Sequence, residues 1–176
     1  MTTGVAIIGC GIAGAAAAYY LTAEGVPVTL IEPDVIGGGA TAAGMGHLLV
    51  LDDNDPEFAL TRYSRDLWNG LAGRLPAEAD YDPCGTLWVA ADDEEMSVVR
   101  QKHAYYKGRG VKAEILDSKS LAQAEPNLRR GMAGGLLLPE DALVYSPRAA
   151  LWLAQQAISR GATLLRASVA SLRPDG

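Results

Sequence analysis

Short apolar runs separated by a helical, small-residue stretch open the chain. Val5 to Ile8 and Val28 to Ile31 are uniformly apolar, which is typical of strands buried in a parallel sheet. The alanine-rich stretch between them has helical composition to about Glu24, and Gly25 supplies its stop signal. The pattern predicts a strand–helix–strand unit that ends at Glu32.

Later apolar spacing and capping residues predict further elements. Asp55-Pro56-Glu57 has the features of a helix start, and Phe58, Leu67 and Leu71 give that helix an apolar side. The predicted helices span 55–74, 92–108 and 146–161, and the predicted strands span 86–90, 111–116, 132–138 and 163–165. No internal repeat, low-complexity segment or long linker interrupts them.

The turn between the first strand and helix carries glycines in the G-x-G-x-x-G spacing. Gly9 permits a sharp exit from the strand, Gly11 lets a pyrophosphate approach the backbone, and Gly14 lets the helix pack close to the strand. The free N–H groups of Ile12 and Ala13 then face the phosphates at the positive end of the helix dipole. This unit predicts a ligand that contains an ADP moiety.

Glu32 ends the second predicted strand, where a carboxylate accepts hydrogen bonds from both ribose hydroxyls. The same charge would repel a 2′-phosphate, which disfavours an NADP-type ligand. Strand, loop, helix, second strand and terminal acid occur in order, but this unit by itself does not distinguish NAD from FAD.

The segment from Gly37 to Gly46 is dense in glycine, alanine and threonine. An NAD-type unit would normally enter its next crossover helix here. Small residues suit a backbone that lies close to a flat ligand, although the same composition also occurs in flexible surface loops. The direct continuation into the apolar run Leu48 to Leu51, with few charged residues, favours the ligand interpretation.

With these residues the chain resembles the D-amino-acid oxidase and glycine oxidase superfamily of FAD-dependent oxidoreductases. The resemblance rests on the glycine fingerprint, Glu32 and "GGGATAAGMG", and it continues through "CGTLWVA", "EPNL" and "LLLPEDALVYSPRAALWLAQQAISRGATLL". It covers nearly the whole chain. Within the superfamily, "MGHLLVLDD" and "FALTRYSRDLW" look most similar to flavin subunits of bacterial hydroxyproline dehydrogenase and hydrogen cyanide synthase.

The resemblance implies an α/β fold, with a Rossmann-like, glutathione-reductase-like FAD-binding domain and an inserted, mainly β substrate domain. Sequence order assigns residues 1–80 and 140–176 to the first domain and 81–139 to the second. Because family members run to roughly twice this length, we expect an N-terminal part whose C-terminal half is missing. The turn-forming end, Pro174-Asp175-Gly176, agrees with that expectation. The 176 residues alone should bind FAD weakly and show no turnover.

The resemblance also implies the chemistry: a hydride leaves the α-carbon of an amine or amino acid for flavin N5, and an imine forms. The subgroup favours a dehydrogenase that passes electrons to a partner subunit or a quinone pathway. No catalytic residue is assigned; His47 follows the glycine-rich segment and is a candidate to approach the flavin. Two alternatives stay open, namely an NAD-dependent dehydrogenase and a noncatalytic FAD-binding subunit.

The resemblance also implies cofactor contacts by position: Ile12 and Ala13 contact the pyrophosphate, Glu32 and Pro33 the adenosine, and Ala40 and Thr41 the phosphates. Ala43, Gly44 and Met45 line the isoalloxazine, and Val169 presents backbone atoms to the adenine edge. Thr41 stands where some relatives carry a histidine that bonds covalently to FAD, so noncovalent FAD is expected. The predicted cofactor-binding residues are Gly9, Gly11, Ile12, Ala13, Gly14, Glu32, Pro33, Gly39, Ala40, Thr41, Ala43, Gly44, Met45 and Val169.

The composition of the chain disfavours some classes of binding partner. The chain carries a net charge of −6 and has no lysine or arginine before Arg62, which disfavours a nucleic-acid partner. Cys10 and Cys84 lie far apart and form no metal-binding pattern, so neither a metal nor a disulfide is expected. No apolar run reaches membrane-spanning length, and the cytoplasm is the default location, with membrane association through partner subunits still compatible.

Overall fold

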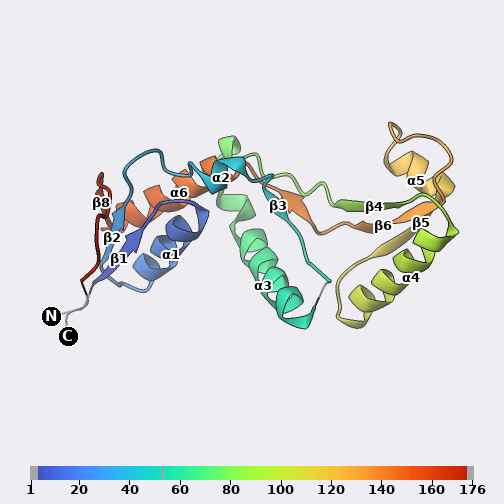
Figure 1. Ribbon diagram of the computed structural model, residues 1–176, viewed down its shortest axis with the longest axis horizontal. Helices are drawn as coiled ribbons and strands as arrows, with labels where there is room; N and C mark the ends of the chain where they lie inside the picture. Colours follow the sequence, from blue (N-terminus) through green and yellow to red (C-terminus); the bar gives the residue numbers. More distant parts are fainter. Residues whose placement is uncertain (1–3, 53, 174–176) are drawn as a thin grey trace. The chain divides into compact units, whose positions relative to one another are not determined.

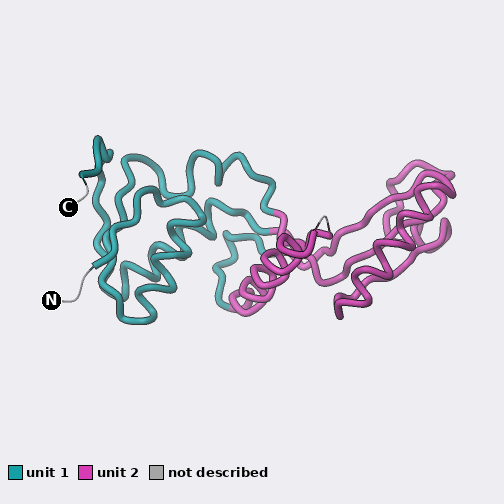
Figure 2. Tube along the Cα trace, turned by 60° about the horizontal axis from the view of Figure 1, so that its bottom comes forward, with its two compact units in different colours: residues 1–46, 74–81, 144–176 teal, residues 47–73, 82–143 magenta. Residues whose placement is uncertain are grey.

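The computed structural model describes residues 4–52 and 54–173, and the predicted turn at 174–176 lies outside them (Figure 1). The chain forms two compact units (Figure 2). Unit 1 comprises 4–46, 74–81 and 144–173; unit 2 comprises 47–73, without residue 53, and 82–143. Each unit is therefore built from segments that are separated in the sequence.

Unit 1 contains a parallel sheet in the order β1-β2-β8. Its strands are β1 (Val5–Ile8), β2 (Val28–Ile31) and β8 (Thr163–Leu165). Helices α1 (Ile12–Ala23) and α6 (Ser146–Ser159) pack against each other through fully buried small residues, which permit close approach: Ala15, Ala18, Ala149, Ala150, Ala154 and Ala157. The short elements α2 (Ala40–Ala43) and η2 (Ala77–Ala79) complete this unit.

An aromatic and cationic cluster joins the helices of unit 1 to the segment 74–81. The ring of Tyr19 lies beside that of Trp152, with 5.8 Å between the ring centroids. The guanidinium of Arg74 lies over both rings and donates to the Tyr19 hydroxyl, while Arg160 lies 4.4 Å from the Tyr19 centroid. These contacts hold a distant part of the chain against α1 and α6.

Unit 2 is built around an antiparallel sheet in the order β4-β6-β5. Its strands are β4 (Thr86–Ala90), β6 (Gly134–Leu138) and β5 (Glu114–Asp117). The helices of this unit are α3 (Asp55–Leu71), α4 (Asp93–Gly108) and α5 (Ser118–Ala124), and η1 (Ala72–Arg74) follows α3. Strands β3 (His47–Leu48) and β7 (Ala142–Leu143) form a separate antiparallel pair.

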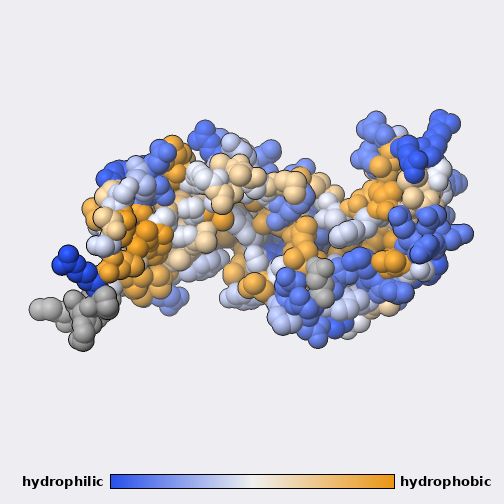
Figure 3. Space-filling view, in the orientation of Figure 1, coloured by the Kyte–Doolittle hydropathy of each residue, from blue (hydrophilic) through white to orange (hydrophobic). Residues whose placement is uncertain are grey.

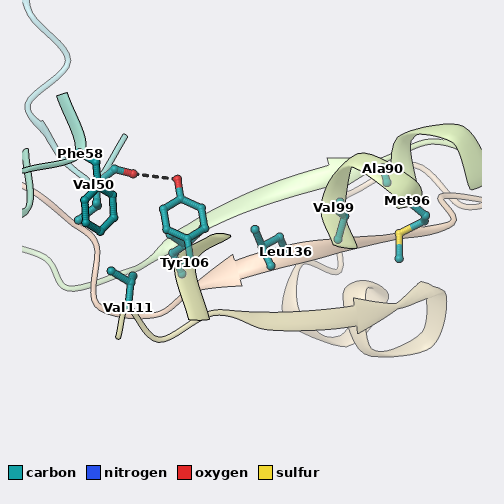
Figure 4. Close-up of a cluster of buried hydrophobic side chains, with 9 residues drawn as sticks. Val50, Phe58, Ala90, Met96, Val99, Tyr106, Val111 and Leu136 are labelled. Atoms are coloured by element: carbon teal, nitrogen blue, oxygen red, sulfur yellow. Dashed lines mark hydrogen bonds between the residues drawn. The ribbon is translucent and has the colours of Figure 1, made fainter. Parts of the chain in front are cut away.

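The core of unit 2 lies where α4 covers the sheet (Figure 4). A Cβ on Gly134 would lie 2.8 Å from the Met96 sulfur, so the absence of a side chain lets α4 approach β6. The hydroxyl of Tyr106 donates to the Val50 carbonyl at 2.9 Å, which ties α4 to the segment after β3. Phe58 from α3 joins the same cluster.

Most predicted elements agree with the structure, with differences at their ends. The predicted strand at 111–116 is observed at Glu114–Asp117, and the run at 48–51 forms strand only at its start, in β3. The N-cap of α3 is Asn54, whose side chain accepts from the Glu57 N–H at 3.0 Å. The sequence analysis did not predict helix α5, whose N-cap Asp117 is also the last residue of β5.

The compact units have other bounds than the predicted domain ranges, chiefly at residues 47–73 and at 140–143, which were both assigned to the first domain. Residues 47–73 were grouped with the N-terminal domain, but they fall in unit 2. Phe58 packs into the core of unit 2, and Arg65 forms ion pairs with Glu140 and Asp141. Contacts made far along the chain therefore decide where this helix belongs.

Candidate cofactor-binding site

The turn from β1 into α1 has the backbone geometry that its glycines predict. Gly9 has a φ of +92°, a backbone conformation that residues other than glycine rarely adopt. A Cβ on Gly14 would lie 2.1 Å from the Gly9 carbonyl oxygen and 3.3 Å from Ile7. Helix α1 therefore lies as close to β1 as the backbone permits, with its first turn at the end of the strand.

Thr41 lies at the start of α1, although it is distant in sequence. Its hydroxyl accepts from the Ile12 N–H at 2.9 Å, and a Cβ on Gly11 would lie 2.9 Å from the same oxygen. The first intrahelical bond runs from the Ala15 N–H to the Gly11 carbonyl, so the preceding amides belong to the open helix end. Backbone N–H groups and one hydroxyl thus converge where a phosphate would bind.

Glu32 follows β2, and both of its carboxylate oxygens accept hydrogen bonds from the backbone. Oε2 accepts from the Cys10 N–H at 2.8 Å, and Oε1 accepts from the Asp34 N–H at 3.0 Å. The bond from Cys10, then that from Asp34, holds the pKa of Glu32 below its usual value. Each oxygen keeps a further lone pair, with which the carboxylate can accept from ribose hydroxyls.

Arg166 is a neighbour of Glu32 that the sequence did not reveal. Strands β2 and β8 are parallel with Ile31 opposite Leu165, so Glu32 and Arg166 leave the sheet at the same edge. The Arg166 guanidinium donates to the Asp34 carbonyl. A cavity of about 510 Å³ opens here, lined by Pro33, Asp34, Val35, Ile36, Leu151 and Arg166. The available signal was a basic residue directly after a predicted strand.

The segment 37–46 is held against the start of α6. Gly37 has φ of +76°, and a Cβ there would lie 2.8 Å from the Pro147 carbonyl oxygen. Gly46 has φ of +73°, and a Cβ there would lie 1.9 Å from the Val144 oxygen. The Gly37 N–H also donates to the Cys10 carbonyl at 2.9 Å. These contacts hold both ends of the segment against the backbone at the start of α6 and the glycine turn.

The remaining predicted residues have different surroundings. Gly39 precedes α2, which begins at Ala40, and the residues predicted to line the isoalloxazine are exposed: Ala43, Gly44 and Met45, the last 79% exposed. Pro33 lines the cavity beside Glu32, and Ala13 lies in the first turn of α1. Val169 lies in the extended segment after β8 and is exposed.

Other chemically capable groups lie apart from this site. Cys10 is buried in the glycine turn, where burial, more than nearby Glu32, raises the pKa of its thiol; Cys84 is exposed in unit 2, and both are free. Within the described ranges, no cluster of histidine, cysteine, aspartate and glutamate could hold a metal ion. No helix in the same part of the chain has the length and apolarity needed to cross a membrane.

The turn, the helix end and Glu32 together have the form of a site for a dinucleotide. Comparison with known proteins identifies the dinucleotide. A model of the FAD dependent oxidoreductase family matches residues 4–176. The chain belongs to this family. The D-amino-acid oxidase and glycine oxidase resemblance is thereby confirmed, and the NAD-dependent alternative is wrong.

Members of this FAD-dependent family with known activities resemble the chain along most of its length. It is 30% identical over 168 residues to glycine oxidase of Geobacillus kaustophilus, covering 91% of this chain and 45% of that protein. The crystal structure of glycine oxidase from Geobacillus kaustophilus matches with a TM-score of 0.85 at 28% identity, over 97% of this chain and 48% of that one. The chain thus spans about half the length of this relative.

Two further relatives differ in their stated roles. The 4-methylaminobutanoate oxidase (formaldehyde-forming) of Paenarthrobacter nicotinovorans is 30% identical over 166 residues, 93% of this chain and 20% of that protein. The mitochondrial pyruvate dehydrogenase phosphatase regulatory subunit of Mus musculus is 28% identical over 159 residues, 89% of this chain and 18% of that protein. Sequences similar to this chain therefore occur in an oxidase and in a protein named as a regulatory subunit.

The residues of the site fit FAD, the cofactor of this family. Gly11 has no side chain, which lets the Thr41 hydroxyl lie against the backbone at the start of α1, in the turn where a pyrophosphate approaches the amides in dinucleotide sites. The carboxylate of Glu32 keeps accepting capacity for a ribose, and the adjoining cavity continues past Pro33. All these features lie within unit 1.

Proposed function

We propose that this chain forms the FAD-binding part of an oxidoreductase that oxidises the C–N bond of an amine or amino acid. The observation that carries the proposal is the convergence of the Ile12 amide, the Thr41 hydroxyl and the open start of α1, in a chain of the FAD-dependent family. Glycine oxidase and 4-methylaminobutanoate oxidase, both named as oxidases of nitrogen-containing substrates, support the substrate class.

The proposed binding is noncovalent and uses unit 1. The Ala13 amide and the Thr41 hydroxyl bind the pyrophosphate, and the Ile12 amide, which donates to Thr41 in this structure, joins them only when Thr41 turns away. Glu32 binds the ribose, and Ala43 to Met45 lie along the isoalloxazine. Thr41 is already engaged by the Ile12 N–H and offers a hydroxyl rather than an imidazole, so it forms no covalent link. When bound, the flavin supplies hydride-accepting chemistry, and the protein positions the substrate.

Unit 2 is proposed to form part of the substrate domain. The expectation of a mainly β region at 81–139 is wrong, because helices α4 and α5 occupy more of that range than strands β4, β5 and β6. The antiparallel sheet supports the proposal, and unit 2 also contains His47, the candidate residue that follows the glycine-rich segment, in the separate β3–β7 pair. The resemblance to hydroxyproline dehydrogenase and hydrogen cyanide synthase subunits supports transfer of electrons to a partner subunit or a quinone. On this proposal the enzyme is a dehydrogenase rather than a producer of peroxide.

A second candidate is a noncatalytic FAD-binding subunit. The similarity to the Mus musculus regulatory subunit favours it, because that protein is named for regulation and not for an oxidation. Such a subunit would bind FAD in the same turn and yet stay oxidised with every amine. The two candidates therefore differ in flavin reduction and agree in flavin binding.

The first experiment tests binding. Gly11→Val places a branched side chain against the Thr41 hydroxyl, where the pyrophosphate approaches, and should abolish copurification of FAD. Gly108→Val is the control, because a Cβ at this helix-end glycine meets nothing within 4 Å. Gly11→Val protein as yellow as the parent would show that this turn does not hold the cofactor.

The second experiment tests catalysis with the full-length, FAD-loaded protein, because the 176 residues alone are expected to show no turnover. A panel of amino acids and secondary amines is added without oxygen, and bleaching of the flavin absorbance is followed. Bleaching supports the oxidoreductase, and its absence across the panel supports the noncatalytic subunit. Substrate-dependent dye reduction without oxygen uptake supports the dehydrogenase, and stoichiometric peroxide contradicts it.

A further inference from the structure

A cavity of about 420 Å³ lies at α5 in unit 2, within the sequence range 118–132 and apart from every residue of the cofactor site. Its inner wall includes Leu121, which is 1% exposed. Figure 3 shows hydrophobic and hydrophilic side chains side by side over the end of the unit that carries α5. The lining consists of Ser118, Leu121, Ala122, Pro126, Leu128, Arg129, Arg130, Gly131 and Met132.

Two consecutive exposed arginines line this cavity. Neither Arg129 nor Arg130 forms a hydrogen bond or ion pair with any other residue of the described ranges. Three other arginines of unit 2 are bonded to the protein: Arg62 to the Arg109 carbonyl, Arg65 to two carboxylates, and Arg109 to Asp55. Arg100 on α4 has no such partner among the described residues, but it stands alone and does not line this cavity. Arg129 and Arg130 place two free guanidinium groups side by side at one cavity, in a chain whose net charge is −6.

The nearby carboxylates are held by the backbone and not by these arginines. Asp117 accepts from the Ser120 N–H at 2.7 Å, and this bond is the largest cause that lowers the pKa of Asp117. Glu125 accepts from the Asn127 N–H at 3.1 Å. The guanidinium groups thus keep their hydrogen-bond donors available, in the fork geometry that suits carboxylate and phosphate oxygens.

We propose that this cavity binds a small organic anion with an apolar body. The anionic group pairs with Arg129 and Arg130, and the apolar body packs against Leu121, Leu128 and Met132. An inorganic anion would leave the apolar wall in water, and an uncharged apolar molecule would leave the arginines unpaired. The volume lies in the range of pockets that hold small molecules.

Octanoate tests the proposal, with octanamide as the uncharged analogue and inorganic phosphate as the anion without an apolar body. Each is titrated into the purified FAD-loaded protein, and the backbone amide NMR signals of residues 118–132 are followed. Octanoate should shift these signals and bind about tenfold tighter than octanamide, because it adds hydrogen bonds to charged groups. Phosphate should bind more weakly than octanoate.

The Arg129→Gln, Arg130→Gln variant should weaken octanoate binding about tenfold and leave octanamide unchanged. The control is the double variant Arg100→Gln, Lys107→Gln, which removes the same charge from α4, outside the cavity. It should change neither the octanoate affinity nor the octanamide affinity. Leu128→Ala should weaken both octanoate and octanamide. Unchanged amide NMR signals of unit 2 outside residues 118–132 show that each variant keeps the fold of this unit.

Three results would overturn the proposal. One is equal affinity for octanoate and octanamide, and another is equal affinity for octanoate and phosphate. The third is the absence of any shift within residues 118–132 at the highest octanoate concentration. Flavin reduction does not enter these measurements, so failure here and failure of the proposed oxidoreductase function are separate outcomes.

Discussion

Arg65 of α3 and Asp141, next to β7, form an ion pair in the interior of unit 2, with 3.2 Å between Nη1 and Oδ1. The two residues are 4% and 1% exposed. Asp141 also accepts from the Thr86 side chain and the Val50 N–H, and its backbone carbonyl accepts from the Gly85 N–H. Burial raises the pKa of Asp141 in spite of these partners. One buried carboxylate thus joins three segments of the unit.

Replacing Arg65 should destabilise the protein strongly. Arg65→Met leaves Asp141 buried without its cation and should lower the free energy of unfolding by about 3–5 kcal/mol, because an uncompensated buried charge remains. Thermal and denaturant unfolding measure this loss. Lys112→Met breaks the exposed pair with Glu140 and should cost at most about 1 kcal/mol. Similar losses in both variants would contradict the assigned role of the buried pair.

The double variant Arg65→Met, Asp141→Leu should recover part of the lost stability, because both charges are removed together. A double variant less stable than Arg65→Met alone would show that the hydrogen bonds of Asp141 to Thr86 and Val50 matter more than its ion pair.

Acidification should loosen the cofactor turn through Glu32. The lowered pKa of Glu32 means that its stabilising bonds are present above the ordinary value of 4.5 and are lost as pH falls through the lower folded value. FAD retention and thermal stability of the wild type should therefore decline below about pH 4.5, followed by flavin fluorescence. Glu32→Gln should lack that part of the pH dependence, whereas the exposed Glu78→Gln should keep it. Identical pH profiles for Glu32→Gln and wild type would exclude this assignment.

Removing the Glu32 carboxylate should also weaken cofactor binding at neutral pH. Glu32→Ala loses the bonds to Cys10 and Asp34 and the proposed bonds to the ribose, for a loss of about 1.5–3 kcal/mol in FAD affinity. Titration of the apoprotein with FAD measures this difference. An affinity equal to that of the wild type would place the ribose elsewhere.

Replacing glycine by alanine should lower FAD affinity at Gly14 and raise the free energy of unfolding at Gly70. Gly14→Ala brings a Cβ to 2.1 Å from the Gly9 carbonyl oxygen, so α1 must move away from β1 and FAD affinity should fall. Gly70→Ala meets nothing within 4 Å in α3 and should stabilise the protein by about 0.5–1 kcal/mol through helix propensity. Unfolding and FAD titration of the two variants give the comparison. A stabilised, fully yellow Gly14→Ala protein would contradict the close packing of α1.

The flavin should leave the protein when the chain is unfolded, because Thr41 offers no covalent attachment. Acid precipitation should release all of the FAD into the supernatant, and Thr41→Ser should behave in the same way. Thr41→Ala should lose the bond from the Ile12 N–H, at a cost of about 0.5–1.5 kcal/mol in stability. Flavin that stays with the precipitate would show a covalent link.

The sequence by itself determined the local unit that begins the fold. Apolar runs of strand length, glycines with positive φ and the helix stop at Gly25 are properties of neighbouring residues, so β1, α1 and β2 were predictable from spacing. The capped helices α3 and α4 were predictable for the same reason, apart from their ends. Glu32 could be placed because it directly follows β2.

The tertiary structure decided which distant residues meet. Thr41 lies at the start of α1 because the segment 37–46 packs against the backbone just before and within α6. The spacing of apolar residues along the chain does not predict this contact. Arg166 lies beside Glu32 because β8 pairs with β2 in one particular register. Residues 47–73 belong to unit 2, where Arg65 forms an ion pair with Asp141 and Phe58 packs into the core. Such contacts depend on side chains far apart in sequence, so only the folded chain shows them.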